Sequence, residues 1–511
     1  MATTYKPAPG HVRLFDPATI FHYSWPNGVR AVVKETQGTG LVTVQVWVRA
    51  GSRYETAMNN GVSHLIEDLA LRGSKNYPRL LALKPGDAIG GGATDALEAL
   101  GGSVSSQTSR DATFYSATVA ASSWPEALRT LADATLHPTL TDVAIEDSRA
   151  DVQEDVQSRA GDPLASVADL AYAVAFTKHP YRRPAGGTPE SVDALTGAQV
   201  RAYYKARYVG PNISVIVVGD VQHAMARTLI GQNFSAAPGA AKQSAAPIPT
   251  ESMPLSFKSA SRRRIDMQNV MLGLAYRAPG IKSPRDVVVM DVLLAHWSEG
   301  SDAALRRVLR GATKASKSGA DETPEDADDE KDDAAPGSGG QAPLALAFNV
   351  DFLTQRDPGL FIVALVVRPQ DRTKAVQATL EEIGRVQKQG IDAAALQRAK
   401  TALVQQYIEQ GETVSGQAGA LGFYEIISDY KFAQQYLDYV TSITLADVKR
   451  VAGRYLSKTS YVQAVVEPMP RPRQRPPGSD SGTITARAER SHRQSAKIAK
   501  SGHYAEINHA K

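Results

Sequence analysis

The sequence contains no cysteine among its 511 residues. Disulfide bonds, thiolate nucleophiles and zinc sites built on cysteine are therefore excluded. A chain without thiols fits an oxidising compartment, where a stray thiol is a liability. We therefore favour the cell envelope or the extracellular space, with the mitochondrial matrix as the alternative for a eukaryotic chain. The compartment itself stays unknown at this stage.

Long apolar runs and a marked charge imbalance are absent as well. No run approaches the roughly 18 apolar residues of a membrane helix, so we expect no transmembrane segment. The first residues, MATTYKPAPGHVRL, lack the apolar core of a signal peptide and the arginine-rich pattern of a transit peptide. The formal net charge is only +4, and the basic residues are scattered outside the C-terminal tail. Proteins that bind nucleic acid concentrate basic residues on one face, so nucleic acid is not an expected partner.

The chain is too long for a single hydrophobic core and should form at least two domains. Two of its segments resemble each other, residues 191–221 and residues 442–468. Each opens with Ser or Thr before an amphipathic helix and continues through a short polar turn into a strand rich in valine. A helix–turn–strand unit that recurs about 250 positions later indicates a duplicated domain.

The duplication predicts an N-terminal domain over residues 1–235 and a C-terminal domain over residues 261–468, joined by an Ala-, Pro- and Ser-rich linker at residues 236–260. Alternating strand patterns and periodic helices mix within each half. This mixture predicts an α+β fold in which helices cover one face of each sheet. Two segments should be disordered because they lack apolar residues. They are an acidic insertion at about residues 313–342 and a basic tail at residues 469–511.

The residues with the clearest chemical potential lie in GVSHLIEDLALRGSKNYP, residues 61–78. His64, Glu67 and Asp68 stand at positions i, i+3 and i+4 of a predicted helix, which places them on one face. A histidine and carboxylates that converge on one face can bind a divalent metal, and a neighbouring glutamate can take a proton from metal-bound water. Taken alone the pattern is weak, because any amphipathic helix can expose one histidine and two acids.

The residues around this helix resemble the M16 metallopeptidases, the group of pitrilysin, insulinase and the mitochondrial processing peptidase. That family carries an inverted zinc motif, H-x-x-E-H, in a phrase similar to G-x-x-H-x-x-E-H-x-x-x-x-G-(T/S)-x-x-x-P. The positions of this chain that fit the phrase are Gly61, His64, Glu67, Gly73, Ser74 and Pro78. Further similar phrases are ALEALGGSVSSQTSRDATFYSATV, SRADVQEDVQ, DVLLAHWSEGSDAALRRVLRG and DPGLFIVALVVRP. The resemblance implies two homologous halves, each a mainly antiparallel sheet covered by helices, that face each other across a cavity.

Two metal positions of the family motif are altered in this chain. Asp68 stands where the family has its second zinc histidine, and the third ligand position falls on Asp155, next to Glu154. If zinc binds, the resemblance implies His64, Asp68 and Asp155 as its ligands and Glu67 as the general base. Aspartate can bind zinc through oxygen. It is shorter than the residues that it replaces, so both aspartates would reach the metal only if the helices moved closer.

A third departure lies in the second half. Family members place an Arg and a Tyr in L-R-x-x-x-x-L-(A/G)-Y, where they contact the substrate. This chain keeps the arginine as Arg310, but Phe348 stands at the tyrosine position after the acidic insertion. A phenylalanine has no hydroxyl with which to stabilise a developing oxyanion.

Three departures spread over both halves favour a catalytically impaired or inactive subunit. Such a subunit would pair with another M16-like chain, as a heterodimer or homodimer, and help to enclose or hold a peptide. The sheet edge near residues 103–110 could accept an extended peptide by strand addition, or the strand could simply be paired within its own sheet. One alternative is an active zinc metalloendopeptidase that uses His64, Asp68 and Asp155 as ligands and Glu67 as base. Another is a stand-alone structural or binding protein.

Overall fold

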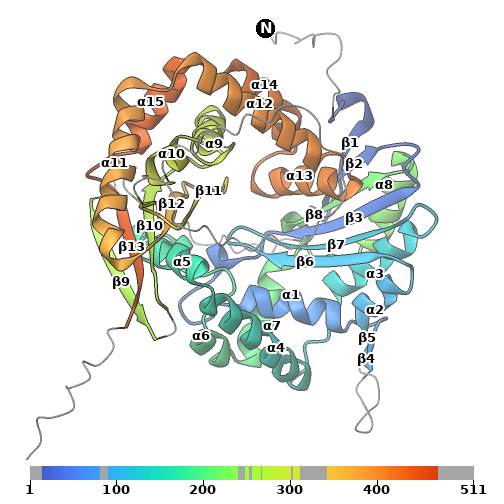
Figure 1. The fold of residues 1–511 in the computed structure, drawn as a ribbon. Coiled ribbons are helices and arrows are strands. Elements are labelled where there is room, and N and C mark those ends of the chain that lie inside the picture. Colours follow the sequence, from blue (N-terminus) through green and yellow to red (C-terminus); the bar gives the residue numbers. More distant parts are fainter. Residues whose placement is uncertain are drawn as a thin grey trace, which may run out of the picture. The chain divides into compact units, whose positions relative to one another are not determined.

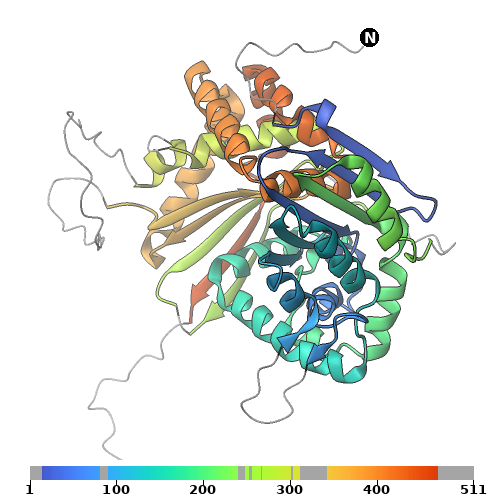
Figure 2. The same cartoon turned by 90° about the vertical axis from the view of Figure 1, so that its right-hand side faces the viewer.

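Two β-sheets organise the computed structural model, which describes residues 14–80, 90–239, 248–251, 256–265, 267–300, 303–310 and 342–469 (Figures 1 and 2). The first sheet has six strands in the order β1-β2-β8-β3-β7-β6, and only the β2–β8 pair is parallel among its described pairs. Its strands are β1 (Ile20–Ser24), β2 (Arg30–Glu35), β3 (Leu41–Val48), β6 (Ser103–Thr108), β7 (Thr113–Ala120) and β8 (Ile213–Gly219).

The second sheet repeats this topology with one strand fewer. Its order is β11-β12-β10-β13-β9, and among its described pairs only β9–β13 is parallel. Its strands are β9 (Lys258–Arg264), β10 (Val270–Arg277), β11 (Ala347–Phe352), β12 (Leu360–Val367) and β13 (Val462–Pro468). The series β2, β8, β3, β7, β6 therefore corresponds to β9, β13, β10, β12, β11, and β1 has no counterpart among the described strands. The predicted α+β fold with two mainly antiparallel sheets is confirmed.

The predicted helix–turn–strand repeat corresponds to α7 (Gly197–Arg207) with β8 and to α15 (Leu445–Tyr455) with β13. Both helices begin with a capping box, in which the N-cap threonine and the residue three positions later exchange hydrogen bonds. In α7 the partners are Thr196 and Gln199, and in α15 they are Thr444 and Asp447. The same local chemistry therefore starts the same unit twice.

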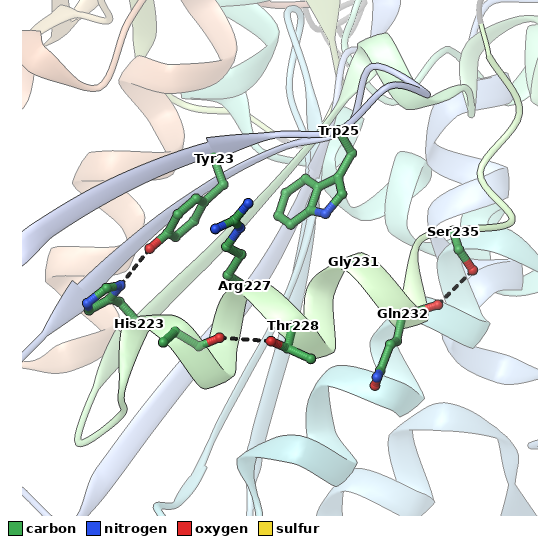
Figure 3. A pocket seen from close by; sticks show the side chains of 9 residues that line it. Tyr23, Trp25, His223, Arg227, Thr228, Gly231, Gln232 and Ser235 are labelled. Atoms are coloured by element: carbon green, nitrogen blue, oxygen red, sulfur yellow. Dashed lines mark hydrogen bonds between the residues drawn. The ribbon is translucent and has the colours of Figure 1, made fainter.

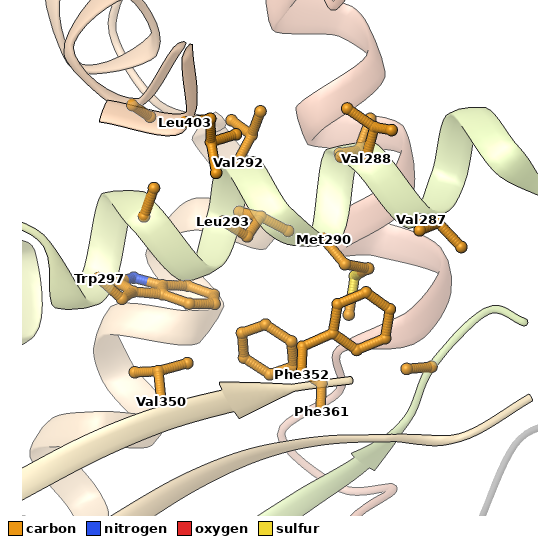
Figure 4. Packing of buried hydrophobic residues seen from close by; sticks show 14 of the residues in the cluster. Val287, Val288, Met290, Val292, Leu293, Trp297, Val350, Phe352, Phe361 and Leu403 are labelled. Atoms are coloured by element: carbon orange, nitrogen blue, oxygen red, sulfur yellow. The ribbon is translucent and has the colours of Figure 1, made fainter. Parts of the chain in front are cut away.

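Helices cover both faces of each sheet, so the prediction that helices cover one face only is wrong. The first half contains α1 (Val62–Arg72), α2 (Gly92–Glu98), α3 (Trp124–Leu136), α4 (Asp142–Gly161), α5 (Pro163–Ala175), α6 (Pro189–Asp193), α7 and α8 (His223–Asn233). The second half contains α9 (Pro284–Ser298), α10 (Ala304–Arg310), α11 (Arg372–Gln389), α12 (Ala393–Gln410), α13 (Val414–Ile427), α14 (Lys431–Ser442) and α15. Figure 4 shows Met290, Leu293 and Trp297 of α9 directed toward Phe352 and Phe361 on the second sheet, where all five are buried.

Two helices cross between the halves. α13, from the second half of the sequence, packs on β3 and β8 of the first sheet, and α5, from the first half, packs on β10 and β13 of the second (Figure 1). The close packing of α13 on β3 requires glycine at position 422, because a Cβ there would lie 2.0 Å from Nε1 of Trp47 on β3. Each sheet takes its strands from one half of the sequence, whereas α5 and α13 each pack on the sheet of the other half.

Several predictions of domain organisation stay predictions. The acidic insertion and the basic tail lie outside the described residues, apart from residues 342 and 469. β9 begins at Lys258, inside the segment assigned as a linker. We keep the domain boundaries, and the cavity expected between the halves, as proposals. Within the described part of the chain, none of the helices combines the length and apolar composition needed to cross a membrane.

Candidate functional site

Helix α1 positions the predicted site residues, and a buried glutamate holds its first turn. Glu55 accepts hydrogen bonds from the backbone N–H groups of Gly61 and Ser63, both at 2.9 Å, and from the side chain of Asn60. These donors belong to the helix N-terminus, whose first N–H groups have no partner within the helix. Gly61 adopts a left-handed conformation with φ of 95°, which explains the glycine at this position.

His64 and Asp155 come together across α1 and α4. The His64 Nε2 atom lies 3.8 Å from the Asp155 Oδ2 atom, while the Asp155 side chain is 72% exposed. Gly186 lies against the other ring nitrogen, since a Cβ at Gly186 would be 3.1 Å from His64 Nδ1. That Nδ1 atom is buried and has no hydrogen-bond partner in the described residues. The structure therefore brings two of the three predicted ligands to the same place.

Glu67 lies on the same face of α1, beneath the edge strand β6. Burial raises the pKa of its carboxyl above the ordinary value, and the nearby hydroxyls of Thr108 and Ser106 on β6 and the positive charge of a protonated His64 partly oppose this. Its Oε2 atom has no hydrogen-bond partner in the part of the chain that the structure describes. A buried carboxyl with a raised pKa is a stronger base than an exposed one, which suits it to accept a proton.

Asp68 is occupied by an ion pair. Nε of Arg72, one helical turn further along α1, lies 2.6 Å from Asp68 Oδ2 without hydrogen-bonding geometry. The same guanidinium contacts Asp151 and approaches Asp147, both on α4. The charge of Asp68 is thus compensated by a cation that is itself held by α4.

These residues do not fit a three-ligand metal site. Within the described ranges, no group of three or more His, Asp or Glu side chains is arranged to hold a metal ion. His64 and Asp155 supply two donors, and Asp68 is paired with Arg72. A catalytic zinc site needs three protein ligands. The ligand set predicted from the sequence therefore stays a prediction.

Arg310 lies at the end of α10 and donates a hydrogen bond of 2.7 Å to the backbone carbonyl of Leu346, just before β11. Phe348 follows on β11, with the guanidinium of Arg306 5.9 Å from its ring centre. Arg310 therefore ties α10 to the start of β11 in this structure. Its predicted contact with a substrate stays a prediction.

β6 is an edge strand, because it pairs with β7 and with no other described strand. Its side chains alternate between exposed (Ser103, Ser105, Gln107) and half-buried. Helix α1 lies against it, which places Glu67 beside the strand. The prediction that a strand near residues 103–110 forms an open sheet edge is confirmed.

Sequence reasoning missed three contributors to this site, Glu55, Arg72 and Gly186. Arg72 had a local signal, since an arginine four residues after an aspartate on a helix is positioned to pair with it. Glu55 contacts the start of α1 across a turn, and Gly186 contacts His64 from a distant loop. Sequence spacing gives no signal for contacts of these two kinds.

Comparison with known proteins agrees with this geometry. The family model for insulinase, peptidase family M16, matches residues 30–189, and the model for the peptidase M16 inactive domain matches residues 194–328 and 340–403. Subunit 1 of the mitochondrial cytochrome b-c1 complex from Bos taurus is 28% identical over 275 residues, which is 53% of this chain and 54% of that protein. An uncharacterized zinc protease of Mycobacterium tuberculosis is 31% identical over 209 residues, 41% of this chain and 45% of that protein.

The matched region thus spans about half the length of these curated relatives. The crystal structure of a protease from Helicobacter pylori superposes with a TM-score of 0.73 at 21% identity, covering 88% of this chain and 99% of that chain. This likeness shows that the two proteins share a fold. Taken with the two family models and the partial zinc motif on α1, it leads to one conclusion. The chain belongs to peptidase family M16.

Proposed function

We propose that this protein is a catalytically inactive M16 subunit that holds an extended peptide and pairs with another M16-like chain. The observation that carries the proposal is the ion pair between Asp68 and Arg72, which occupies the position of the second zinc ligand. Because Arg72 also contacts Asp151 on α4, its guanidinium is held beside Asp68, and freeing Asp68 for a metal would break this ion pair. The helix face keeps the layout of a peptidase site without a complete ligand set.

The peptide-holding role rests on the open edge of β6. The N–H of Ser109 donates a hydrogen bond of 2.8 Å to the carbonyl of Ala112, on the side of β7. Because successive residues of a strand point their backbone groups in opposite directions, the N–H and C=O of Ser106 point to the free edge. An added strand would use these groups, and its side chains would pass over the α1 helix. Holding a peptide here needs only the strand edge, so it does not depend on a metal.

The pairing role draws on the relatives. Subunit 1 of the cytochrome b-c1 complex is by name one component of an assembly. An M16 chain with an intact H-x-x-E-H motif would supply the chemistry that this chain lacks. Size-exclusion chromatography of the chain alone and mixed with such a partner tests the pairing directly. For compartment, the missing cysteines favour the cell envelope, or the mitochondrial matrix for a eukaryotic chain.

One observation favours a second function, a zinc endopeptidase that uses His64, Asp68 and Asp155 with Glu67 as base. His64 Nδ1 and Glu67 Oε2 are buried polar atoms without hydrogen-bond partners in the described residues. Such atoms are costly unless something binds them. Against this function, Asp68 would have to leave Arg72, and both aspartates are shorter than the family ligands.

The edge of β6 is tested by replacing Ser106 with proline. Proline removes the outward N–H of an edge strand, a position where the sheet tolerates it. We expect Ser106→Pro to weaken binding of fluorescein-labelled oxidised insulin B chain by about tenfold or more, because a peptide added there loses a backbone bond and meets the proline ring. Fluorescence anisotropy gives the affinity. Ser106→Ala keeps the N–H and should bind like the wild type, and equal weakening by both variants would contradict the proposal.

A further inference from the structure

The free edges of the two sheets differ in how they are protected. Natural sheets blunt exposed edges with charged side chains, which discourage pairing with another chain. The edge strand β9, KSASRRR, follows this rule with Lys258 and a run of arginines. The edge strand β1, IFHYS, has no Lys, Arg, Asp or Glu, and no described strand of the second sheet corresponds to it. The edge of β1 therefore lacks the charged side chains that discourage pairing with another chain.

A groove of about 750 Å³ lies between β1 and α8 (Figure 3). Helix α8 packs against β2 and α3, and Tyr23 of β1 and Trp25 of the turn after it line the groove beside α8. The groove is lined by Tyr23, Trp25, His223, Ala224, Arg227, Thr228, Gly231, Gln232 and Ser235. It lies at the opposite edge of the sheet from β6, so it is distinct from the candidate site on α1.

The polar groups of this groove are held in place. The hydroxyl of Tyr23 lies 2.6 Å from Nδ1 of His223, and the His223 ring stacks on Phe21 with centroids 3.7 Å apart. Glu35 accepts the backbone N–H of His223 at 2.7 Å. These contacts connect the first turn of α8 to β1 and β2, which makes the groove a preformed one.

Arg227 is the charged group that the groove leaves available. Its guanidinium lies 5.4 Å from the centre of the Tyr23 ring, and Figure 3 shows it between the rings of Tyr23 and Trp25. It forms no ion pair with a carboxylate in the described part of the chain, whereas most arginines of the first half do. A guanidinium stacked on an aromatic ring still presents its N–H groups at its edge, where a carboxylate can accept two of them.

The backbone of β1 offers a second set of contacts. The N–H of Trp25 donates to the carbonyl of Val29 at 3.0 Å, toward β2. Because successive residues of a strand alternate in direction, His22 and Ser24 direct their N–H and C=O groups away from β2. No described strand pairs with that edge.

We propose that the groove between β1 and α8 binds an extended acidic segment of a partner protein, which adds as a strand to β1 and places a carboxylate on Arg227. The open edge supplies main-chain hydrogen bonds, and the groove supplies side-chain selection. The acidic character follows from the unpaired guanidinium, and the extended conformation follows from the free groups of His22 and Ser24. This inference does not rest on the inactivity of the α1 site.

The test uses the full-length protein and the fluorescein-labelled peptide VTEVETV in an anisotropy titration. We expect Arg227→Gln to weaken binding by about tenfold or more, as removal of a hydrogen-bonded charge does. The peptide VTQVQTV, without carboxylates, should bind wild type and Arg227→Gln equally weakly. Arg201→Gln serves as a matched control, because Arg201 is an exposed arginine of the same half that already pairs with Asp142.

Strand addition is tested in the same assay. Ser24→Pro removes an outward N–H and should reduce binding, whereas Ser24→Ala and the β6 variant Ser106→Pro should leave it unchanged. Full displacement of the peptide by millimolar free glutamate would assign the groove to a small carboxylate and overturn the proposal. Unchanged affinity in Arg227→Gln, or no binding of VTEVETV by the wild type, would also overturn it.

Discussion

Replacing Asp68 by histidine and Asp155 by glutamate is expected to give the protein about one bound zinc ion per chain, the stoichiometry of a single three-ligand site. His64 Nε2 and Asp155 Oδ2 are already 3.8 Å apart, so α1 and α4 are close enough for a shared metal. A histidine at position 68 no longer attracts Arg72, which keeps its contacts with Asp147 and Asp151 on α4. The longer side chain of a glutamate at position 155 brings its carboxylate closer to His64 and α1. Elemental analysis after dialysis against trace zinc measures the result.

The same double substitution combined with His64→Ala is the control for this gain. It removes one of the three ligands, so its zinc content should fall back to the level of the wild type. If the double variant keeps the wild-type circular dichroism spectrum and binds no zinc, then the helices themselves are misplaced. That outcome would show that more than the side chains at positions 68 and 155 prevents metal binding.

Replacing Asp291 by asparagine is expected to stabilise the protein at about pH 8 and to have little effect at about pH 4. Asp291 on α9 accepts a hydrogen bond of 3.0 Å from the hydroxyl of Tyr436 on α14, and burial raises its pKa from 3.8 to about 7. Below about pH 4 this carboxyl is protonated in both the folded and the unfolded state. Between about pH 4 and pH 7 the unfolded state loses the proton and the folded state keeps it, so stability falls as the pH rises.

Asparagine has no charge to bury, and its Oδ1 atom can still accept from Tyr436. The free energy of unfolding at about pH 8 should therefore rise by up to about 4 kcal/mol, since each pKa unit corresponds to about 1.4 kcal/mol. Urea unfolding of wild type and variant at both pH values measures the difference. Asp438→Asn, at an exposed aspartate of α14, should change stability at neither pH. Equal gains for Asp291→Asn at both pH values would show that the effect is not due to the charge.

The sequence was sufficient for features that depend on local spacing. The shared face of His64, Glu67 and Asp68 follows from helical periodicity, and the helix forms where that periodicity predicts it. The repeated unit was visible because Thr196 and Thr444 begin equivalent helices with the same cap chemistry. These features need only a few neighbouring residues to be specified.

Features that depend on distant contacts were not predictable from the sequence. Nothing in the local spacing of residues indicates that α5 and α13 each cover the sheet of the other half. The pairing of Asp68 with Arg72 had a local signal, whereas the contacts of Arg72 with α4 cross about 80 residues of chain. The β1–α8 groove joins Tyr23 and His223, which are 200 residues apart.

Mass spectrometry of an incubated peptide tests the proposal that this M16 protein holds peptide without cutting it. Oxidised insulin B chain is incubated with the wild type and with Glu67→Gln in the presence of zinc, and the products are compared over time. We expect intact peptide in both samples, because Asp68 is paired with Arg72 and no group of three metal ligands is present in the described residues. Fragments that appear with the wild type and not with Glu67→Gln would contradict it and establish a peptidase that uses Glu67 as its base.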